Sequence, residues 1–249
     1  MNKMLHYFWI DLKMMFRVPL SLFFTILFPQ LLMIVLVSTN NNPIIYENIH
    51  QVDVLIPSLC LFSLFSSGII GFSNVIGINK EKKLLEMYKL KGLNPSHILS
   101  MQLLTNMILS FISMILVIIT SKLFYNAIIP SFNLLIKFFL VWILAAIIMF
   151  AIGFIIGIFS KNGKVSQTIS TPVSFVLMTI SGVLANITTF PSNVLRIVRY
   201  NPTTQVYYYL FNNWAAKPLH SLETSWYVLF IWIIIFAIII LYGIKKKRI

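Results

Sequence analysis

Long apolar runs separated by short polar stretches make up most of this chain. A helix needs about twenty apolar residues to cross a bilayer, and these runs follow neither a strand-period nor a helix-period alternation. The pattern predicts an all-α polytopic membrane protein, in which residues 1–249 form a single transmembrane domain. The six predicted spans cover residues 20–37, 54–78, 98–124, 134–159, 165–184 and 226–244.

The segment before the first span, residues 1–17, is amphipathic. Its apolar positions share one side of a helix and its charged positions share the other, a pattern typical of a helix lying flat at the membrane surface. Lys13, Arg17 and Pro19 would interrupt a longer first span, so we favour the interfacial helix over that alternative.

Charge is concentrated in one interior stretch, residues 79–96, which reads NKEKKLLEMYKLKGLNPS. The stretch predicts a short helix from Glu81 to about Lys91, ended by Gly92 and Pro95. Taken alone, such a stretch between two spans is a solvated loop.

The distribution of positive charge predicts the orientation. The formal net charge is +13, and 19 residues are Lys or Arg. With both termini cytoplasmic, all but five of these fall on the cytoplasmic side, which satisfies the positive-inside rule. The five outside are Lys122, Lys137, Arg196, Arg199 and Lys217. We interpret the charge as that of a multi-pass cell-membrane protein attracted to anionic lipid headgroups, and not as a sign of nucleic-acid binding.

The predicted spans contain almost no charge. Asp53, Lys122 and Lys137 lie near span ends, where side chains can reach the interface. Carriers coupled to ions or protons usually need a charged residue near mid-membrane. The energy for any uphill transport would therefore come from a component that is not embedded in the membrane.

Polar residues recur within two spans. Those of the second and fifth spans are Ser63, Ser66, Ser67, Ser73, Asn74, Gln167, Thr171, Ser174 and Ser181. Small hydroxyl residues let helices approach closely, and the pattern alone favours this contact role over the lining of a translocation path. Gly153 and Gly157 form a GxxxG packing motif in the fourth span.

The connection before the last span, residues 185–225, is amphipathic and interrupted by prolines. It predicts two short helices, about residues 192–200 and 203–214, split at Asn201 and Pro202. Its aromatic residues suit a membrane interface: Tyr207, Tyr208, Tyr209, Phe211 and Trp214. The segment is either an outer cap or a re-entrant hairpin.

Motifs for catalysis are missing from the sequence. There is no GxxxxGK[ST] nucleotide-binding loop, no HExxH, and no Cys/His cluster with metal-ligand spacing. The single cysteine, Cys60, lies in an apolar run. We expect no enzymatic activity, no metal and no cofactor bound by this chain.

The charged stretch also carries a family resemblance. Glu81 and Lys82 start a leucine-rich turn with Leu84, Leu85 and Leu90, which residues 92–96, GLNPS, then stop. With the six spans and the interfacial helix, this arrangement resembles ABC type-2 transporter permeases, in particular the small six-span drug or peptide exporters. Lys83 and Leu84 stand where that family commonly has Gly-Thr. A second likeness is the family's Gly–Pro–Pro pattern before the last span, matched by Gly182, Pro191, Asn201 and Pro202.

The resemblance implies a set of partners and roles. The chain would pair with an identical or paralogous permease and bind two copies of a cytosolic ABC ATPase, on which ATP and Mg would bind. Spans two and five would line the path, and the four residues of the Gly–Pro–Pro pattern would belong to an outer gate. The ATPase-coupling residues would be Glu81, Lys82, Leu84, Leu85, Glu86, Met87, Tyr88, Leu90 and Gly92.

The resemblance leaves the cargo open between several classes. The leading hypothesis is export of an amphipathic or hydrophobic molecule, such as an antibiotic, an antimicrobial or cytolytic peptide, or a lipid-like compound. The alternatives are export of a lipid-linked glycan and a non-transporting membrane protein with an immunity or sensor role. An integral membrane enzyme is disfavoured by the missing catalytic cluster.

Overall fold

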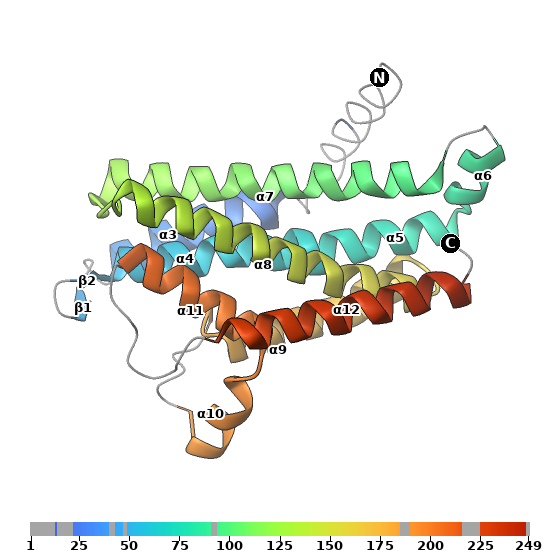
Figure 1. The fold of residues 1–249 in the computed structure, drawn as a ribbon. Coiled ribbons are helices and arrows are strands. Elements are labelled where there is room, and N and C mark those ends of the chain that lie inside the picture. Colours follow the sequence, from blue (N-terminus) through green and yellow to red (C-terminus); the bar gives the residue numbers. More distant parts are fainter. Residues whose placement is uncertain are drawn as a thin grey trace.

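Long helices lie side by side along most of the chain (Figure 1). The computed structural model describes residues 13, 22–39, 43–46, 49–90, 94–184, 190–215 and 225–247. The predicted interfacial helix, residues 1–17, therefore lies outside the described residues apart from Lys13. The described part is helical except for one short antiparallel pair of strands, β1 (Ile44–Tyr46) and β2 (Ile49–His50), which confirms the all-α class.

Within the described ranges, four helices are long and apolar enough to cross a membrane, and they match four predicted spans. They run over Gln51–Glu81, Ser96–Tyr125, Phe132–Phe159 and Trp226–Lys245. The first of these joins α4 (Gln51–Leu64), a π-helical segment η2 (Phe65–Gly71) and α5 (Phe72–Glu81). The other three are α7 (Pro95–Tyr125), α8 (Phe132–Phe159) and α12 (Trp226–Lys247).

The predicted first and fifth spans correspond to shorter helices. The first is η1 (Phe23–Leu27) followed by α3 (Phe28–Thr39), and the fifth is α9 (Gly163–Ser181). With 19 residues, α9 would extend over about 28 Å, slightly less than the hydrocarbon core of a typical bilayer. A count of six spans stays a prediction.

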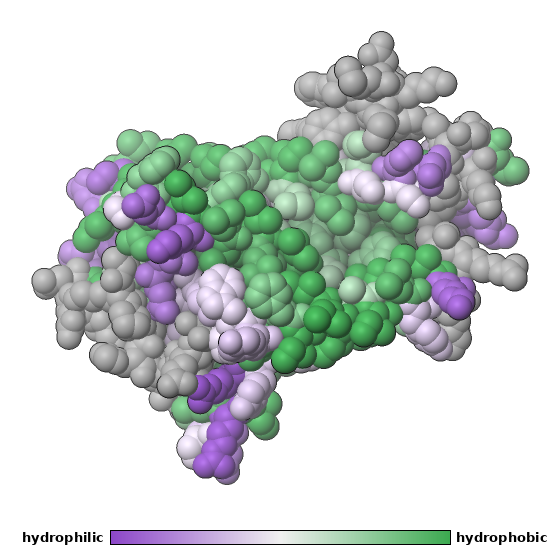
Figure 2. Space-filling model, viewed as in Figure 1, coloured by the Kyte–Doolittle hydropathy of each residue, from purple (hydrophilic) through white to green (hydrophobic). Residues whose placement is uncertain are grey.

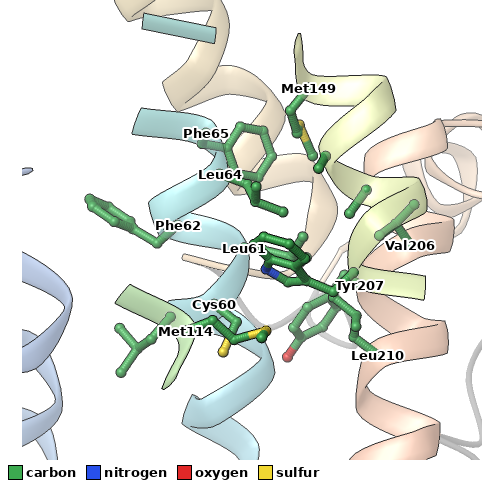
Figure 3. Close-up of a cluster of buried hydrophobic side chains, with 14 of the residues drawn as sticks. Cys60, Leu61, Phe62, Leu64, Phe65, Met114, Met149, Val206, Tyr207 and Leu210 are labelled. Carbon is green, nitrogen blue, oxygen red and sulfur yellow. The ribbon is translucent and has the colours of Figure 1, made fainter. Parts of the chain in front are cut away.

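The α4–η2–α5 helix forms the centre of the bundle. In its most apolar window, 78% of the residues are buried inside the chain, against 17% for α12. Figure 3 shows the buried side chain of Phe65 close to Met149 of α8, and that of Leu61 close to Tyr207 and Leu210 of α11 (Pro202–Ala215). Because this helix is covered on several sides, most of its residues contact protein and not lipid.

The GxxxG motif of α8 packs directly on the central helix, Gly153 against η2 and Gly157 against α5, which confirms its predicted packing role. A Cβ atom at Gly153 would lie 2.0 Å from the carbonyl oxygen of Gly68, far inside van der Waals contact. A Cβ at Gly157 would lie 2.7 Å from the Cβ of Ile76. Both positions therefore need glycine, because the two backbones approach too closely for any side chain.

Two helices follow α9, as predicted, with slightly different bounds: α10 (Ser192–Val198) and α11. The prediction that the aromatic residues of α11 lie at a membrane interface is wrong. Tyr207, Tyr208 and Tyr209 are 6%, 1% and 8% exposed, because α11 packs among α4, α8, α9 and α12. The hydroxyl of Ser58 donates to the Tyr207 hydroxyl across 3.3 Å, so that a polar tip is satisfied inside the protein.

Asp53 also differs from expectation. Its carboxylate was predicted to lie where it can reach the interface, but it is 3% exposed and lies under the connection between α7 and α8. The backbone N–H of Ile128 in that connection donates to its Oδ1 across 3.0 Å. Oδ1 of Asp53 thus provides the hydrogen-bond partner that this backbone amide of the connection needs.

The surface has a broad apolar band between two hydrophilic ends (Figure 2). We call one end of the bundle the α6 end, because it carries the short helix α6 (Leu84–Leu90). At this end α5 and α8 end and α7 begins (Figure 1). The opposite end carries β1 and β2. The band is the surface expected of a protein surrounded by lipid tails.

Candidate functional site at the α6 end

The central helix ends at Glu81, and a separate short helix, α6 (Leu84–Leu90), follows. The predicted single helix starting at Glu81 is therefore wrong at its start. Lys83 has a φ of 51°, in the left-handed region, which ends a right-handed helix. The amide of Met87 bonds the carbonyl of Lys83 across 3.1 Å and begins the new helix in another direction.

The α6 helix extends beyond the bundle and exposes apolar side chains (Figure 1). Leu90 is 89% exposed and Met87 is 41% exposed, whereas Leu84 and Tyr88 are partly buried. Glu86 and Lys82 are exposed beside them. Leu85 belongs to α6 by its backbone, but its side chain lies outside the described residues, as does all of Gly92.

Three consecutive residues just before this turn bond three different helices. The first is Asn79, which is 3% exposed. Its Nδ2 donates to Oε1 of Gln102 in α7 across 2.7 Å. This bond ties the end of α5 to the third predicted span.

The second residue, Lys80, bonds the end of α8. Its Nζ donates to the carbonyl oxygens of Ile158 and Ser160, the latter across 2.8 Å. A cation is stabilising at this position, because the unpaired carbonyls at a helix C-terminus carry partial negative charge.

The third residue, Glu81, bonds the start of α9. The backbone N–H of Gly163 donates to Oε2 of Glu81 across 3.2 Å. Next to it, Oδ1 of Asn162 accepts from the amide of Val165 across 2.8 Å. We call Asn79, Lys80 and Glu81 the junction triplet, because together they connect the base of α6 to α7, α8 and α9.

The sequence reasoning included only Glu81 of this triplet. It missed Asn79 and Lys80 as site residues, and it missed their partners Gln102 and Gly163. The one available signal was the position of the three polar residues at the end of an otherwise apolar span.

The polar residues of the second span lie mostly inside the chain. Ser63, Ser66, Ser67 and Ser73 are each no more than 8% exposed. The hydroxyl of Ser67 bonds the hydroxyl of Ser110 in α7, which joins η2 to a neighbouring helix. These positions account for helix contacts within the chain, and a role in the translocation path stays a prediction.

On α9, a serine stripe faces the central helix. Ser166, Ser170, Ser174 and Ser181 are fully buried, and the Ser166 hydroxyl donates to the Ser73 carbonyl across 2.7 Å. The sequence analysis named Ser174 and Ser181 but missed Ser166 and Ser170, although their spacing of four continues the same face.

The other polar positions named in these two spans are less buried. Gln167 is exposed at the edge of the α9 stripe, and Thr171 and Asn74 are partly buried. Of the polar residues named in these two spans, Gln167 is therefore the one that is exposed, and the others are buried or partly buried.

The predicted outer-gate residues lie at helix ends away from the α6 end. Gly182 has a φ of 96° and ends α9, and Pro191 precedes the first residue of α10. Oδ1 of Asn201 accepts from the amide of Thr203 across 2.9 Å, which caps the start of α11 at Pro202. Their geometry explains why a glycine, prolines and an asparagine occur here.

Within the described ranges, no group of three or more His, Cys, Asp or Glu side chains could hold a metal ion. The described part is thus a bundle of apolar helices with a short, exposed helix, α6, at one end. The family comparison agrees: residues 36–244 match the family described as ABC-2 family transporter protein. The chain belongs to this family and is an ABC-2 type permease. No curated protein matches it.

Proposed function

We propose that this chain is the membrane-spanning subunit of an ATP-driven exporter, and that a separate cytosolic ABC ATPase docks on α6. The observation that carries the proposal is the exposure of Leu90 and Met87 on a short charged helix beyond the bundle. Apolar side chains projecting from such a helix are the anchors that a groove on a partner protein would bury. The exposed Lys82, Lys83 and Glu86 would surround them as a polar rim.

The junction triplet would transmit the motion of the docked ATPase. A displacement of α6 acts on the end of α5, which is bonded to α7, α8 and α9 through side chains of successive residues. Packed helices change between discrete arrangements and do not deform continuously. The ATPase would therefore bias two arrangements of the spans without entering the membrane.

The orientation and span count complete the proposal. Described lysines gather at the α6 end, including Lys80, Lys82, Lys83, Lys161 and Lys245, which favours a cytosolic α6 end with both termini inside. Six spans would then cross the membrane, with η1–α3 and α9 as the two short ones. The α10–α11 hairpin would lie at the outer side as a re-entrant gate.

The translocation path would form where this chain meets a second permease, identical or paralogous. Gln167, an exposed polar side chain of α9, would face such a path. The cargo we propose is amphipathic or hydrophobic, because the predicted spans offer hydroxyl and aromatic groups and almost no charge. Two copies of the ATPase would supply the ATP and Mg sites.

Affinity purification of the tagged chain from native membranes tests this proposal. We expect an ABC ATPase to co-purify in an amount comparable to the chain, together with a second permease of the same or a paralogous sequence. Recovery of the chain without any ABC ATPase would favour a non-transporting role and would overturn the proposal.

A further inference from the structure

An apolar cavity of about 470 Å³ lies between α7 and α12, lined also by α8 and by Phe72 of α5. It lies on the face seen in Figure 2, in the half of the apolar band nearer the α6 end. Neither the junction triplet nor the serine stripe of α9 contributes to it. It is therefore separate from the site described above.

The length of the cavity corresponds to one leaflet. Along α7 it extends from Ser96 to Met107, and eleven helical steps of 1.5 Å give about 16 Å. The hydrocarbon core of a bilayer is about 30 Å thick, so the length of the cavity matches the thickness of one leaflet. That is the depth that a single acyl chain occupies.

The cavity is polar at its Ser96 end and apolar toward its Met107 end. Its polar side chains are Ser96 and Ser100, in the first two turns of α7, and the remaining lining is apolar. Deeper in, Phe72 packs against Phe150 and Phe154 with ring centroids 5.5 and 6.1 Å apart. A ligand that fits this gradient has a polar end at the α6 side and a long apolar chain.

Basic residues follow the lining residue of α12 that lies nearest the polar end. Ile244 of α12 lines the cavity, and residues 245–247, which follow it, are all lysine. The cavity also begins at the N-terminal turn of α7, where backbone N–H groups carry partial positive charge. Among the residues that the structure describes, the acidic ones at this end are Glu81, which is bonded to Gly163, and Glu86 on α6.

We propose that this cavity binds one acyl chain of an anionic phospholipid, whose headgroup lies at the lysines that end α12. Basic positions between helices at the cytoplasmic side of membrane proteins are known to hold anionic headgroups. In the proposed orientation the lipid would come from the inner leaflet. The site needs no ATPase, so its presence does not depend on the proposed function.

Native mass spectrometry of the purified chain, after addition of equimolar phosphatidylcholine and phosphatidylglycerol, tests this proposal. We expect the wild-type chain to retain phosphatidylglycerol with a preference of about fivefold or more over phosphatidylcholine. Ala151→Phe, which fills the cavity from α8, should lose the retained lipid. Leu140→Phe adds the same ring at a lipid-exposed position of α8 outside the cavity and should retain it.

A second set of variants tests whether the lysines that end α12 recognise the headgroup. Replacement of residues 245–247 by glutamine should leave a lipid bound but remove the preference, whereas Lys161→Gln, at an exposed lysine of the same end, should not. Leu103→Trp narrows the cavity from α7 and replaces Ala151→Phe if that variant does not fold. Equal retention by the Ala151 and Leu140 variants, or equal retention of both lipids by the wild-type chain, would overturn the proposal.

Discussion

Glu81, the last residue of α5, accepts a hydrogen bond from the backbone N–H of Gly163, the first residue of α9, across 3.2 Å. One position earlier, Lys80 donates to carbonyl groups at the end of α8. An anion thus lies at a helix N-terminus and a cation at a helix C-terminus, the favourable arrangement for both helix dipoles. The central helix holds the α8–α9 turn by charge as well as by packing.

The contribution of Glu81 to α9 can be measured by amide hydrogen exchange. We expect Glu81→Ala to speed exchange in the first turn of α9 by about two- to fivefold, because an exposed charge at a helix terminus contributes about 0.3–1 kcal/mol. Glu86→Ala removes an exposed carboxylate five positions later, on α6, and should leave that turn unchanged. Equal exchange in both variants would show that Glu81 does not stabilise the start of α9.

Glycine substitutions test the contact between α8 and the π-helical segment. Gly153→Ala should lower the free energy of unfolding by about 1–3 kcal/mol, because its Cβ would lie 2.0 Å from the Gly68 carbonyl oxygen. Gly243→Ala places a Cβ 3.1 Å from a side-chain methyl of Ile158, which can shift, and should be close to neutral. Thermal unfolding of the detergent-solubilised variants distinguishes them, and a larger loss for Gly243→Ala would contradict this packing.

Much of the fold could be predicted because the length of an apolar run is a direct physical requirement for crossing a bilayer. The runs located α7, α8 and α12, and the GxxxG motif located a close contact between α8 and the central helix. The break before α6 could not be predicted in this way. It depends on a left-handed backbone at Lys83, a residue type that gives no signal for that conformation.

The site was predicted only in part, because its bonds join residues far apart in the sequence. Glu81 and Gly163 are separated by 82 positions, and Asn79 and Gln102 by 23. In the same way, three consecutive tyrosines suit a membrane interface by composition, yet α11 buries Tyr207, Tyr208 and Tyr209 because helices surround it. Burial on all sides is a property of the tertiary arrangement and not of the local pattern.

Buried residues that join helices should respond differently to substitution from exposed residues of the proposed translocation path. Ser67→Ala removes the bond to Ser110 and should lower stability by about 0.6–1 kcal/mol with little effect on ATP hydrolysis by the assembled transporter. Gln167→Ala changes an exposed side chain and should alter cargo-stimulated ATP hydrolysis while stability stays unchanged. The reverse result, an effect of Ser67→Ala on hydrolysis alone, would place the path along the buried serines.

Cysteine accessibility tests the orientation. Cys60 is fully buried, so the wild-type chain should not react with a membrane-impermeant maleimide in intact cells. Phe132→Cys, at a position 77% exposed at the start of α8, should react from outside. Leu90→Cys should react only after the membrane is permeabilised, and labelling of Leu90→Cys in intact cells would reverse the proposed topology.

The central claim is that α6 docks the ATPase, and its most direct test is the amount of ABC ATPase that co-purifies with matched variants of the chain. Leu90→Asp replaces an apolar side chain of α6 that is 89% exposed, and Ile197→Asp replaces one on α10 that is 76% exposed. Loss of a central apolar anchor typically costs about 2 kcal/mol or more of binding free energy, so we predict at least about a tenfold loss of ATPase for Leu90→Asp. Ile197→Asp should retain the wild-type amount, and equal recovery of the ATPase with both variants would contradict docking at α6.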